Sequence, residues 1–427
     1  MNFDIIEFLK SLVSLNTSEY LKSVLGEQAW VNFAANLLGV VILSTANLLI
    51  VIFLIWLERK VIARMQDRIG PNRVGGRYGL LQTVADVIKL LIKEDISPIG
   101  VDKVTYWLAP FLTVIAALMV WAVIPFAPDV IGVDLSIGVF YVLAISSASV
   151  VALLFAGWGS NNKYALLGAF RAVAQLVSYE VPMILALLVP ILLARTMSTV
   201  GIVEAQSVPY ILVVPMAALI FFVSALAETG RTPFDLLEAE SEIVAGFHIE
   251  YTGMKFGMFF LAEFISTLFM SAFFATIFLG GYRFFGLENV VVGDGWEIGR
   301  LLGFIVFVVK MFAVYFVFIW IRATWPRVRV DQILNFNWKF LVPVSLALIL
   351  LIALLDKLIP VGYNEYGRAA ILLVGNLVLA FVTIEILRYN GRRQREADAG
   401  SDGYAEALVV HDAHEHAAHE HEVAAAH

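Results

Sequence analysis

AETGRTPFDLLEAESEIVAGFHIE, residues Ala227–Glu250, lies between two long apolar segments and gathers acidic residues around a single basic one. The basic residue is Arg231, and the acids are Glu228, Asp235, Glu238, Glu240, Glu242 and Glu250. Thr232, Pro233 and Asp235 are spaced as the N-cap, first and third residues of a helix, with the proline where its missing N–H does no harm. The stretch therefore predicts a short helix that begins at Pro233.

The spacing of these charges would place most of them on one face of any helix that covers them. Steps of three and four residues lead from Glu228 to Arg231, Asp235, Glu238 and Glu242. Carboxylates on one face repel one another when ionised, and this repulsion favours proton binding by some of them. A row of such groups beside a bilayer can take up and release protons.

The composition is that of a polytopic membrane protein. Hydrophobic residues make up 60% of the 427 and charged residues 15%, whereas soluble domains have about 45–50% and about 25%. The net charge is -7, but six of the seven histidines and a cluster of acids fall in the last few dozen residues, so the total says little about the rest. Nucleic acid is not an expected partner.

Cysteine is absent, and His248 is the only histidine outside the C-terminal tail. The membrane part therefore cannot hold an iron–sulfur cluster on thiolates or a haem between two histidines. We expect no cofactor to be bound by this chain itself, and any electrons that move nearby must be carried by another subunit. The sequence shows no Walker motif, nucleophile elbow, dinucleotide fingerprint or fixed metal site.

Nine apolar runs are long enough to cross a bilayer, judged against about 20 residues per crossing. The predicted fold is therefore all-α, a polytopic membrane helix bundle of about nine transmembrane helices. The runs occupy residues 34–57, 105–125, 138–158, 165–194, 209–227, 255–281, 301–321, 340–359 and 368–387.

These runs divide the chain into four segments. Residues 1–33 have acids where a signal peptide has lysines, and we interpret them as a retained interfacial helix. Residues 34–359 form an eight-helix membrane core that contains the acidic loop 227–254, and residues 360–390 add one further crossing. Residues 391–427 form a tail rich in His and acids that could bind Zn or Ni, but we interpret it as disordered because no spacing there fixes a ligand geometry.

Basic residues are distributed unevenly among the loops, which predicts an orientation. The loop after the first crossing is rich in Lys and Arg from Arg59 to Lys103, whereas the next loop, around Asp129 and Asp134, carries none, and later loops keep this alternation. The positive-inside rule then places the N-terminus outside and the C-terminus and the acidic stretch on the cytoplasmic side. We expect a bacterial cell membrane.

Residues 78–94, within that first loop, form a predicted amphipathic helix. Apolar residues recur there at helical spacing, while Gln82, Asp86, Lys89 and Lys93 lie on the other face. Such a helix should lie along the membrane surface. The alternative interpretation is a solvated linker.

Polar and ionisable side chains also fall inside the predicted crossings. An unpaired charge costs about 2.5–3.5 kcal/mol at the bilayer centre, so each should face protein or water, unless it snorkels or only makes structural hydrogen bonds. Pro182 should also free a backbone carbonyl in the fourth crossing. The side chains are Arg171, Gln175 and Glu180 in the fourth crossing, Glu263 in the sixth and Lys310 in the seventh.

Five motifs in this chain resemble those of one known family. In order they are ERKVIARMQDRIGPNRVG (Glu58 to Gly75), LLQTVADVIKLLIKE (Leu80 to Glu94), FRAVAQLVSYEVP (Phe170 to Pro182), AETGRTPFDLLEAESEIVAGFHIEY (Ala227 to Tyr251) and WIRATWPRVRVDQILNFNWKFLVP (Trp320 to Pro343), the last matching a loop. Together they look like the signature segments of the membrane-embedded H subunit (subunit 1) of proton-translocating NADH–quinone oxidoreductase, respiratory complex I.

The resemblance implies a subunit without a redox centre that forms much of the quinone chamber and its entrance from the bilayer. It implies quinone as substrate, FMN and Fe–S clusters in partner subunits, and contacts with peripheral-arm quinone-site subunits and antiporter-like membrane subunits. By the same resemblance, the chamber and entrance residues would be Arg59, Arg68, Asp86 and Lys89. The acidic funnel would contain Glu228, Arg231, Asp235, Glu238, Glu240, Glu242 and Glu250, and Glu180, Glu263 and Lys310 would carry the proton path inward.

Two residues depart from the family pattern, and two other functions stay open from the residues alone. Gly230 stands where Asn is usual, and Phe264 stands where Tyr is common, so position 264 offers no hydroxyl. A secondary cation transporter or channel would also need intramembrane charges, but it would not concentrate the acids at one surface. A structural anchor would leave the charges inside the crossings without a purpose. Whether the quinone is menaquinone or ubiquinone is not decided by the sequence.

Overall fold

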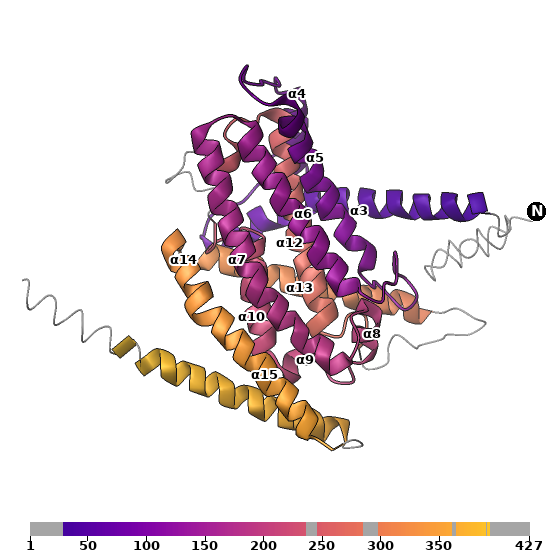
Figure 1. Ribbon diagram of the computed structural model, residues 1–427. Coiled ribbons are helices and arrows are strands. Elements are labelled where there is room, and N and C mark those ends of the chain that lie inside the picture. The colour runs from indigo at the N-terminus through magenta and orange to yellow at the C-terminus, as the bar shows by residue number, and fades with distance from the viewer. Residues whose placement is uncertain (1–28, 236–245, 285–297, 361–363, 390, 393–427) are drawn as a thin grey trace, which may run out of the picture. The chain divides into compact units, whose positions relative to one another are not determined.

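The computed structural model describes residues 29–235, 246–284, 298–360, 364–389 and 391–392. Within these ranges no strand occurs, and only Ala127 and Val130 form an isolated bridge. The predicted all-α fold is therefore confirmed (Figure 1). The α-helices are α3 (Ala29–Met65), α4 (Gln82–Ile92), α5 (Lys103–Met119), α6 (Gly138–Gly159), α7 (Lys163–Ala194), α8 (Thr199–Glu204), α9 (Tyr210–Val213), α10 (Pro215–Glu228), α12 (Gly253–Phe278), α13 (Ile298–Thr324), α14 (Val330–Phe336) and α15 (Val342–Leu358), with shorter helical segments η1 (Val120–Val123), η2 (Gly246–His248) and η4 (Asn337–Leu341).

Eight helices in the described ranges are long and apolar enough to cross a membrane, one fewer than predicted. They are α3, α5 with η1, α6, α7, α12, α13, the continuous run from α14 to α15, and a helix at Glu365–Tyr389. The fifth predicted crossing is instead split into α9 and α10, because Pro215 has no N–H with which to continue the first helix. The 14 residues of α10 span about 21 Å, less than the hydrocarbon core of about 30 Å.

Two predicted helix boundaries were wrong. Helix α3 continues eight residues beyond position 57, so Arg59 and its basic neighbours lie on the helix and not in a loop. Basic side chains such as Arg64 in its last turn stabilise the negative end of the helix dipole. Residues 330–339, expected to lie in the loop between the seventh and eighth crossings, are helical as α14 and the start of η4, and only residues 325–329 join α13 to α14.

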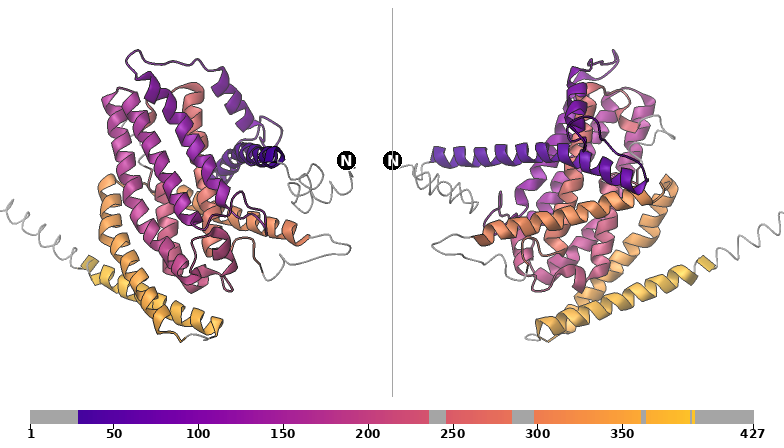
Figure 2. Two further views of the ribbon diagram at one scale, coloured as in Figure 1. Left: turned by 45° about the vertical axis from the view of Figure 1, so that its right-hand side comes forward. Right: turned by 180° about the vertical axis from the view of Figure 1, so that it is seen from behind.

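The chain divides between Leu373 and Val374 into two compact units. In the first unit, α6 packs between α5 and α7, α12 packs against α5 and α13, and α10 and α15 pack against α7. Helix α3 runs across this bundle at a steep angle to α5 and α6 (Figures 1 and 2). The second unit contains the last part of the apolar helix Glu365–Tyr389.

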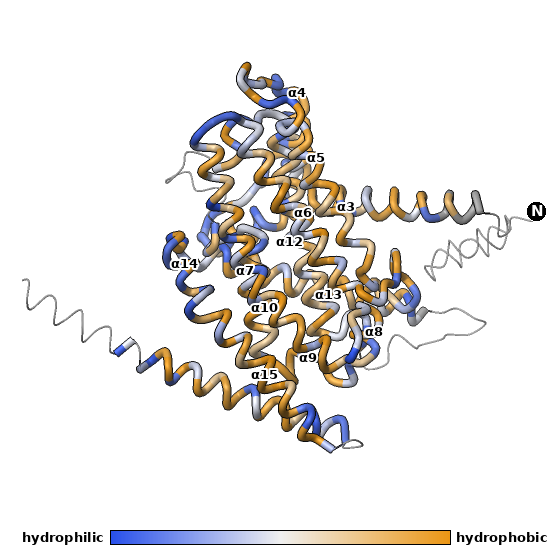
Figure 3. The backbone as a smooth tube through the Cα atoms, in the orientation of Figure 1, coloured by the Kyte–Doolittle hydropathy of each residue, from blue (hydrophilic) through white to orange (hydrophobic). Residues whose placement is uncertain are grey.

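Hydrophobic residues run along the long helices of the first unit, and hydrophilic ones gather near helix ends and in loops (Figure 3). Small residues allow the closest helix contacts. A Cβ atom added at Gly157 of α6 would lie 2.3 Å from Ala169 Cβ of α7. Side-chain caps start the helices, since Asp102 Oδ1 accepts from Val104 N at the start of α5 and Asn162 Oδ1 accepts from Tyr164 N at the start of α7.

Pro182 frees a carbonyl inside α7, as predicted. The carbonyl four residues earlier belongs to Ser178, and it accepts a hydrogen bond from Asn337 Nδ2 at 2.6 Å. The freed backbone group is therefore satisfied by a side chain of η4, and the proline site joins two membrane-spanning segments.

Candidate functional site

The end of α10 does not lead into the predicted helix. Gly230 N donates to Ala227 O at 3.2 Å, and Arg231 N donates to Leu226 O at 3.3 Å. Gly230 has a φ of 63°, so this is a Schellman arrangement with its left-handed residue at Gly230. Glycine and asparagine are the residues that best tolerate this conformation. The prediction that Glu228 and Arg231 share one helix face was wrong, because a helix end lies between them.

The predicted helix start at Pro233 was also wrong, since the chain forms turn and coil from there to the end of the described segment at Asp235. Carbonyls that a helix would use internally are bonded elsewhere. Pro233 O accepts from Val328 N at 3.1 Å, and Phe234 O accepts from Gln175 Nε2 at 2.8 Å. These bonds fix the turn against α7 and the link before α14.

Four charged side chains from α3, the turn after α10, α12 and α13 meet in the interior. Arg231 lies between two carboxylates, with its Nη1 3.2 Å from Glu58 Oε1 and its Nε 3.1 Å from Glu263 Oε1. Arg322 Nη1 also donates to Glu58. We call Glu58, Arg231, Glu263 and Arg322 the central charge cluster. The Arg231 side chain is 2% exposed and that of Glu58 is 8% exposed, so this ion pair is largely shielded from water.

The surroundings of Arg231 hold it in place between its two partners. Its Nε also lies 3.4 Å from Thr267 Oγ1, and its Cζ lies 4.4 Å from the centre of the Phe264 ring, which can attract the cation through its π face. The charges of the two carboxylates and the two guanidinium groups add up to zero when all four are ionised. A change in the protonation of either carboxylate would therefore change the charge balance around Arg231.

Three residues of this region were missed by sequence reasoning: Glu58, Arg322 and Tyr315. Glu58 and Arg322 were counted with the loops because the first predicted crossing ended at residue 57 and the seventh at 321. Neither Gly nor Pro occurs between residues 58 and 69, a signal that would have carried the helix through Glu58. Tyr315 of α13 is 1% exposed and interacts electrostatically with both carboxylates of the cluster, but nothing in its apolar run distinguishes it.

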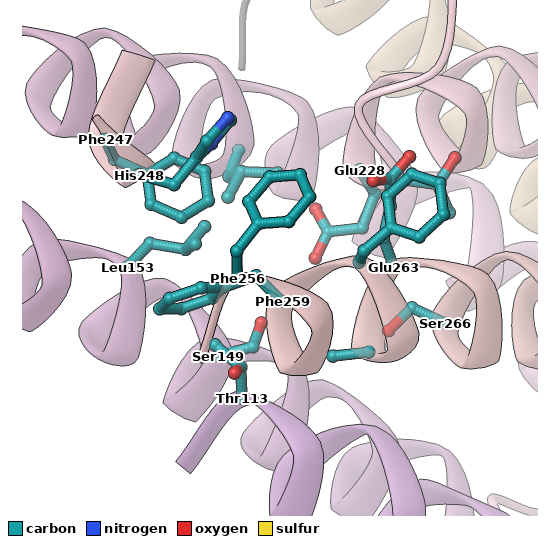
Figure 4. Close-up of a pocket in the computed structure, with 14 residues that line it drawn as sticks. Thr113, Ser149, Leu153, Glu228, Phe247, His248, Phe256, Phe259, Glu263 and Ser266 are labelled. Atoms are coloured by element: carbon teal, nitrogen blue, oxygen red, sulfur yellow. The ribbon is translucent and has the colours of Figure 1, made fainter. Parts of the chain in front are cut away.

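A pocket lies beside the cluster, among α5, α6, α7, α10, α12 and η2 (Figure 4). About 100 Å³ of it is open to water, which is room for several water molecules. Figure 4 shows Glu228 and Glu263 close together at one end and His248 with Phe247 at the other. Hydroxyl-bearing residues and apolar side chains complete the lining, among them Thr113, Ser149, Ser266, Leu153, Phe256 and Phe259.

His248 lies in η2 and packs against two aromatic rings. Its ring centre is 5.0 Å from that of Phe247 and 5.2 Å from that of Phe256. Burial lowers the pKa of His248 to about 4, so its imidazole is neutral at pH 7. The η2 turn can sit this close to α7 because Gly168 has no side chain, since a Cβ there would lie 2.7 Å from the Gly246 carbonyl carbon.

Glu180 and Glu228, which the sequence analysis placed in the inward path and the acidic funnel respectively, lie near each other. They are close enough to interact electrostatically. Each has a buried carboxylate oxygen, Oε1 of Glu180 and Oε2 of Glu228, that accepts no hydrogen bond from any described residue. Two acids with buried, unbonded oxygens at a water-sized pocket are suited to binding protons.

Glu250 is held in a different place from Glu228. Its Oε1 accepts from Asn162 Nδ2 at 2.7 Å, and its backbone carbonyl accepts from Tyr106 Oη at 2.7 Å. Nearby, buried Lys255 Nζ lies 3.0 Å from Asp95 Oδ2 and 3.8 Å from the centre of the Trp107 ring. Glu250 thus belongs to the contacts that join α7, α5 and the start of α12.

Lys310 is also remote from the central charge cluster. Its Nζ donates to three backbone carbonyls just after α12, those of Leu279, Gly281 and Arg283, at 2.7, 2.9 and 2.6 Å. Lys310 and Arg322 are 12 positions apart on α13, which corresponds to about 18 Å along the helix. In this structure Lys310 secures the end of α12 and lies outside the cluster.

The predicted chamber and entrance residues lie around the end of α3 and along α4, which pack against each other and against α12. Arg59 Nη1 bonds Asp86 Oδ2 at 2.5 Å, joining the two helices. Arg68 lines a charged pocket of about 410 Å³ at the end of α3, and Lys89 is exposed on α4. A helix is found within the predicted range 78–94 as α4, with exposed apolar residues at its N-cap, Leu81, and along one side, including Ile88, Leu91 and Ile92.

The remaining predicted acids are only partly described. Asp235 is half-buried at the end of the described segment. Glu238, Glu240 and Glu242 lie outside the described residues. Among the residues that are described, no three His, Asp or Glu side chains are grouped closely enough to hold a metal ion, and the chain has no cysteine.

Comparison with known proteins decides the family. A profile of the family described as NADH dehydrogenase matches residues 38–353. The chain is 50% identical over 311 residues to the H subunit of NADH-quinone oxidoreductase from Dehalococcoides mccartyi, a match that covers 73% of this chain and 82% of the relative. The chain belongs to the H-subunit family of NADH-quinone oxidoreductase.

Other relatives carry the same name and are covered almost completely. The H subunit of Geobacillus kaustophilus is 47% identical over 337 residues, 78% of this chain and 97% of the relative. The H subunit of Bacillus cytotoxicus is 44% identical over 331 residues, 77% of this chain and 96% of the relative. As a member of the H-subunit family, the chain is a multi-pass membrane subunit of bacterial complex I.

Proposed function

We propose that this chain forms the quinone chamber of its complex and the entrance to that chamber from the bilayer, and that it couples quinone reduction to proton translocation. The entrance lies where α3, α4 and α12 pack together. The exposed apolar side of α4 offers a surface for an isoprenoid tail. Arg59, Asp86 and Arg68 at the same place offer polar partners for a quinone head group.

The observation that carries the coupling proposal is the position of Arg231 between Glu58 and Glu263. Glu263 also lines the pocket that contains Glu228, and Glu228 interacts with Glu180. Buried and half-buried carboxylates therefore continue from the cluster through the pocket to α7. Asp235, Glu238, Glu240 and Glu242 would extend this set toward the chamber, and Glu250 and Lys310 would act at its margins.

Reduction of a quinone to a quinol takes two electrons and two protons. The electrons come from flavin and Fe–S centres in partner subunits, since this chain has no cysteine to hold a cluster. Proton uptake near the chamber changes which of the carboxylates around Arg231 carry a proton. Once one carboxylate is protonated, Arg231 is attracted more strongly to the other, and this shift can be passed to the next membrane subunit. The acidic stretch and the C-terminus lie on the cytoplasmic side of the cell membrane in this proposal.

The test replaces Glu263 by Gln in the assembled complex. Quinone reductase activity and the number of protons pumped per electron should fall, by about 10-fold or more in rate if a proton-transfer group is lost. NADH oxidation by ferricyanide, which does not need the quinone site, should be unchanged. Glu204→Gln, at an exposed glutamate on α8, is the matched control. Normal quinone reduction together with normal pumping in Glu263→Gln would refute the proposal.

A further inference from the structure

Gln175 of α7 holds both ends of the turn that follows α10. It is 1% exposed, and its amide nitrogen donates one hydrogen bond to Ala227 O at 2.7 Å and another to Phe234 O at 2.8 Å. Ala227 immediately precedes Glu228, and Phe234 is the third residue after Arg231. One buried amide therefore closes the segment that carries two charged residues of the candidate site.

The orientation of this amide is set by its acceptors. Both are carbonyl oxygens, which cannot donate a hydrogen bond, so only the NH₂ end of the amide can face them. The other end, Gln175 Oε1, is buried and accepts no hydrogen bond from any described residue. An unbonded buried oxygen reduces the net contribution of the side chain to stability. What the amide fixes without such an offset is the place of the turn.

Bonds within the turn set its shape, and bonds to other elements set its place. Within the turn, Phe234 N donates to Arg231 O at 2.9 Å. The two bonds from Gln175 join the turn to α7, and the bond from Val328 N to Pro233 O at 3.1 Å joins it to the link before α14. Loss of the Gln175 bonds would therefore free the turn from α7 without removing the bonds that shape it.

The contacts of Arg231 depend on where this turn lies. Its Nη1 is 3.2 Å from Glu58 Oε1 and its Nε is 3.1 Å from Glu263 Oε1, so a displacement of about 1 Å away from either carboxylate would break that hydrogen bond. Glu228, at the other end of the turn, lines the same pocket as Glu263. By fixing the turn, Gln175 fixes how these charges face α3 and α12.

We propose that Gln175 is a positioning residue for the coupling of quinone reduction to proton translocation. This inference rests on the proposed function. Gln175 holds the turn so that Arg231 stays within reach of both of its carboxylate partners, and it neither takes nor gives a proton itself. Because its amide bonds lead to the turn after α10 and not to the proposed entrance at α3, α4 and α12, its loss should slow turnover without weakening the binding of quinone.

The experiment is Gln175→Met in the whole assembled complex, a change that keeps the length of the side chain and removes both donors. The kcat of quinone reduction should fall on the order of 10- to 100-fold, and the number of protons pumped per electron should fall with it. The KM for quinone should stay within about twofold of the native value. Ferricyanide reduction and the amount of assembled complex should stay at the native level.

Gln206→Met is the matched control. Gln206 is also buried, and its Nε2 donates to two backbone carbonyls of α12, those of Thr276 and Ile277, at 3.3 and 3.0 Å. Its loss should shorten the thermal half-life of the complex about as much as the loss of Gln175, but kcat and pumping should stay native. An equal fall of kcat and pumping in both variants would show that lost stability is the cause and would overturn the inference.

Gln175→Glu adds a readout that a lost packing contact would not change. When protonated, the new carboxyl can donate to one of the two carbonyls, and when ionised it can donate to neither. The rate of this variant relative to that of the native complex at the same pH should therefore rise as the pH is lowered. A relative rate that does not change with pH would contradict the inference, and this series decides the matter if Gln175→Met does not assemble.

The outcomes separate this inference from the proposed function. If Glu263→Gln lowers quinone reduction but Gln175→Met is native in kcat and in pumping, Gln175 is not a positioning residue and the coupling proposal stands. If both variants are native, the coupling proposal is wrong and this inference is wrong with it.

Discussion

Replacing Arg231 with Met is the most informative single perturbation, because Arg231 joins the turn after α10 to both α3 and α12. Its contacts with Glu58 at 3.2 Å and Glu263 at 3.1 Å each correspond to a Coulomb attraction of about 5 kcal/mol at an effective dielectric constant of about 20. Most of this is offset by desolvation of the ions. Removing one partner of a buried pair nevertheless costs about 3–5 kcal/mol, because the remaining charge stays buried.

The effect should be measured on the complex as it exists in the membrane. Unfolding of large assemblies is irreversible, so the half-life of ferricyanide and quinone reductase activities at a fixed elevated temperature is the suitable measure. A loss of about 3 kcal/mol would shorten that half-life by up to about 100-fold. The amount of assembled complex, followed by native electrophoresis, should fall with it.

Two further variants test the reason for the loss. Arg231→Lys keeps the charge but loses the forked donors that reach both carboxylates, so its half-life should lie between those of the native protein and Arg231→Met. Adding Glu263→Gln to Arg231→Met removes one uncompensated charge and should recover about 1–3 kcal/mol of coupling. A native half-life in Arg231→Met, or no recovery in the double variant, would show that the cluster does not hold these helices together.

Three other changes have separate expected results. Lys255→Met removes the bond to Asp95, a charge-assisted hydrogen bond whose loss costs about 1.5–3 kcal/mol of stability, and should loosen the segment between α4 and α5. The KM for quinone should then rise several-fold while kcat stays within about twofold of the native value. A change in kcat alone would contradict this expectation. The pKa of His248 is about 4 in the folded protein and about 6.5 in an unfolded chain, so stability should fall as the pH drops from about 6.5 towards 4, by about 3 kcal/mol in total. His248→Phe should therefore flatten the pH dependence of the thermal half-life. An unchanged slope would show that this histidine is not responsible. Gly168→Ala should push η2 away from α7, since the new Cβ would lie 2.7 Å from the Gly246 carbonyl carbon. We expect overpacking to lower stability by about 1–3 kcal/mol and quinone reduction to become slower. Native stability and a native rate would show that the turn adapts freely.

Helix α4 and eight of the nine predicted crossings could be located from the sequence because their signals are local. Apolar periodicity from residue 80 to 91 located α4, and hydropathy located the long apolar helices, although it could not show that the run from 209 to 227 is broken at Pro215. Helix ends were less predictable. The first crossing was ended at residue 57, where charges begin, but tertiary contacts to Glu58 keep α3 helical through this region.

The contacts of the central charge cluster could not be predicted from the spacing of charged residues along the sequence. Glu58 and Arg231 are 173 positions apart, and no local pattern indicates which acid a distant arginine will meet. The predicted helix start at Pro233 was wrong for a related reason, since the carbonyls of Pro233 and Phe234 accept hydrogen bonds from Val328 and Gln175, which approach only after the fold has formed. Glu180 and Glu228 could be singled out from the sequence because each is an acid within or beside an apolar helix, but their nearness to each other could not be predicted.

The bond between Glu58 and Arg231 also constrains how the chain can enter the membrane during synthesis. At about 5–20 residues per second, the 173 positions between them take about 9–35 s to translate, and Arg322 follows Glu58 by 264 positions. Throughout that interval α3 carries an acid whose partners have not yet left the ribosome. We therefore expect the end of α3 that carries Glu58 to stay in contact with water or lipid headgroups until Arg231 and Arg322 have been synthesised.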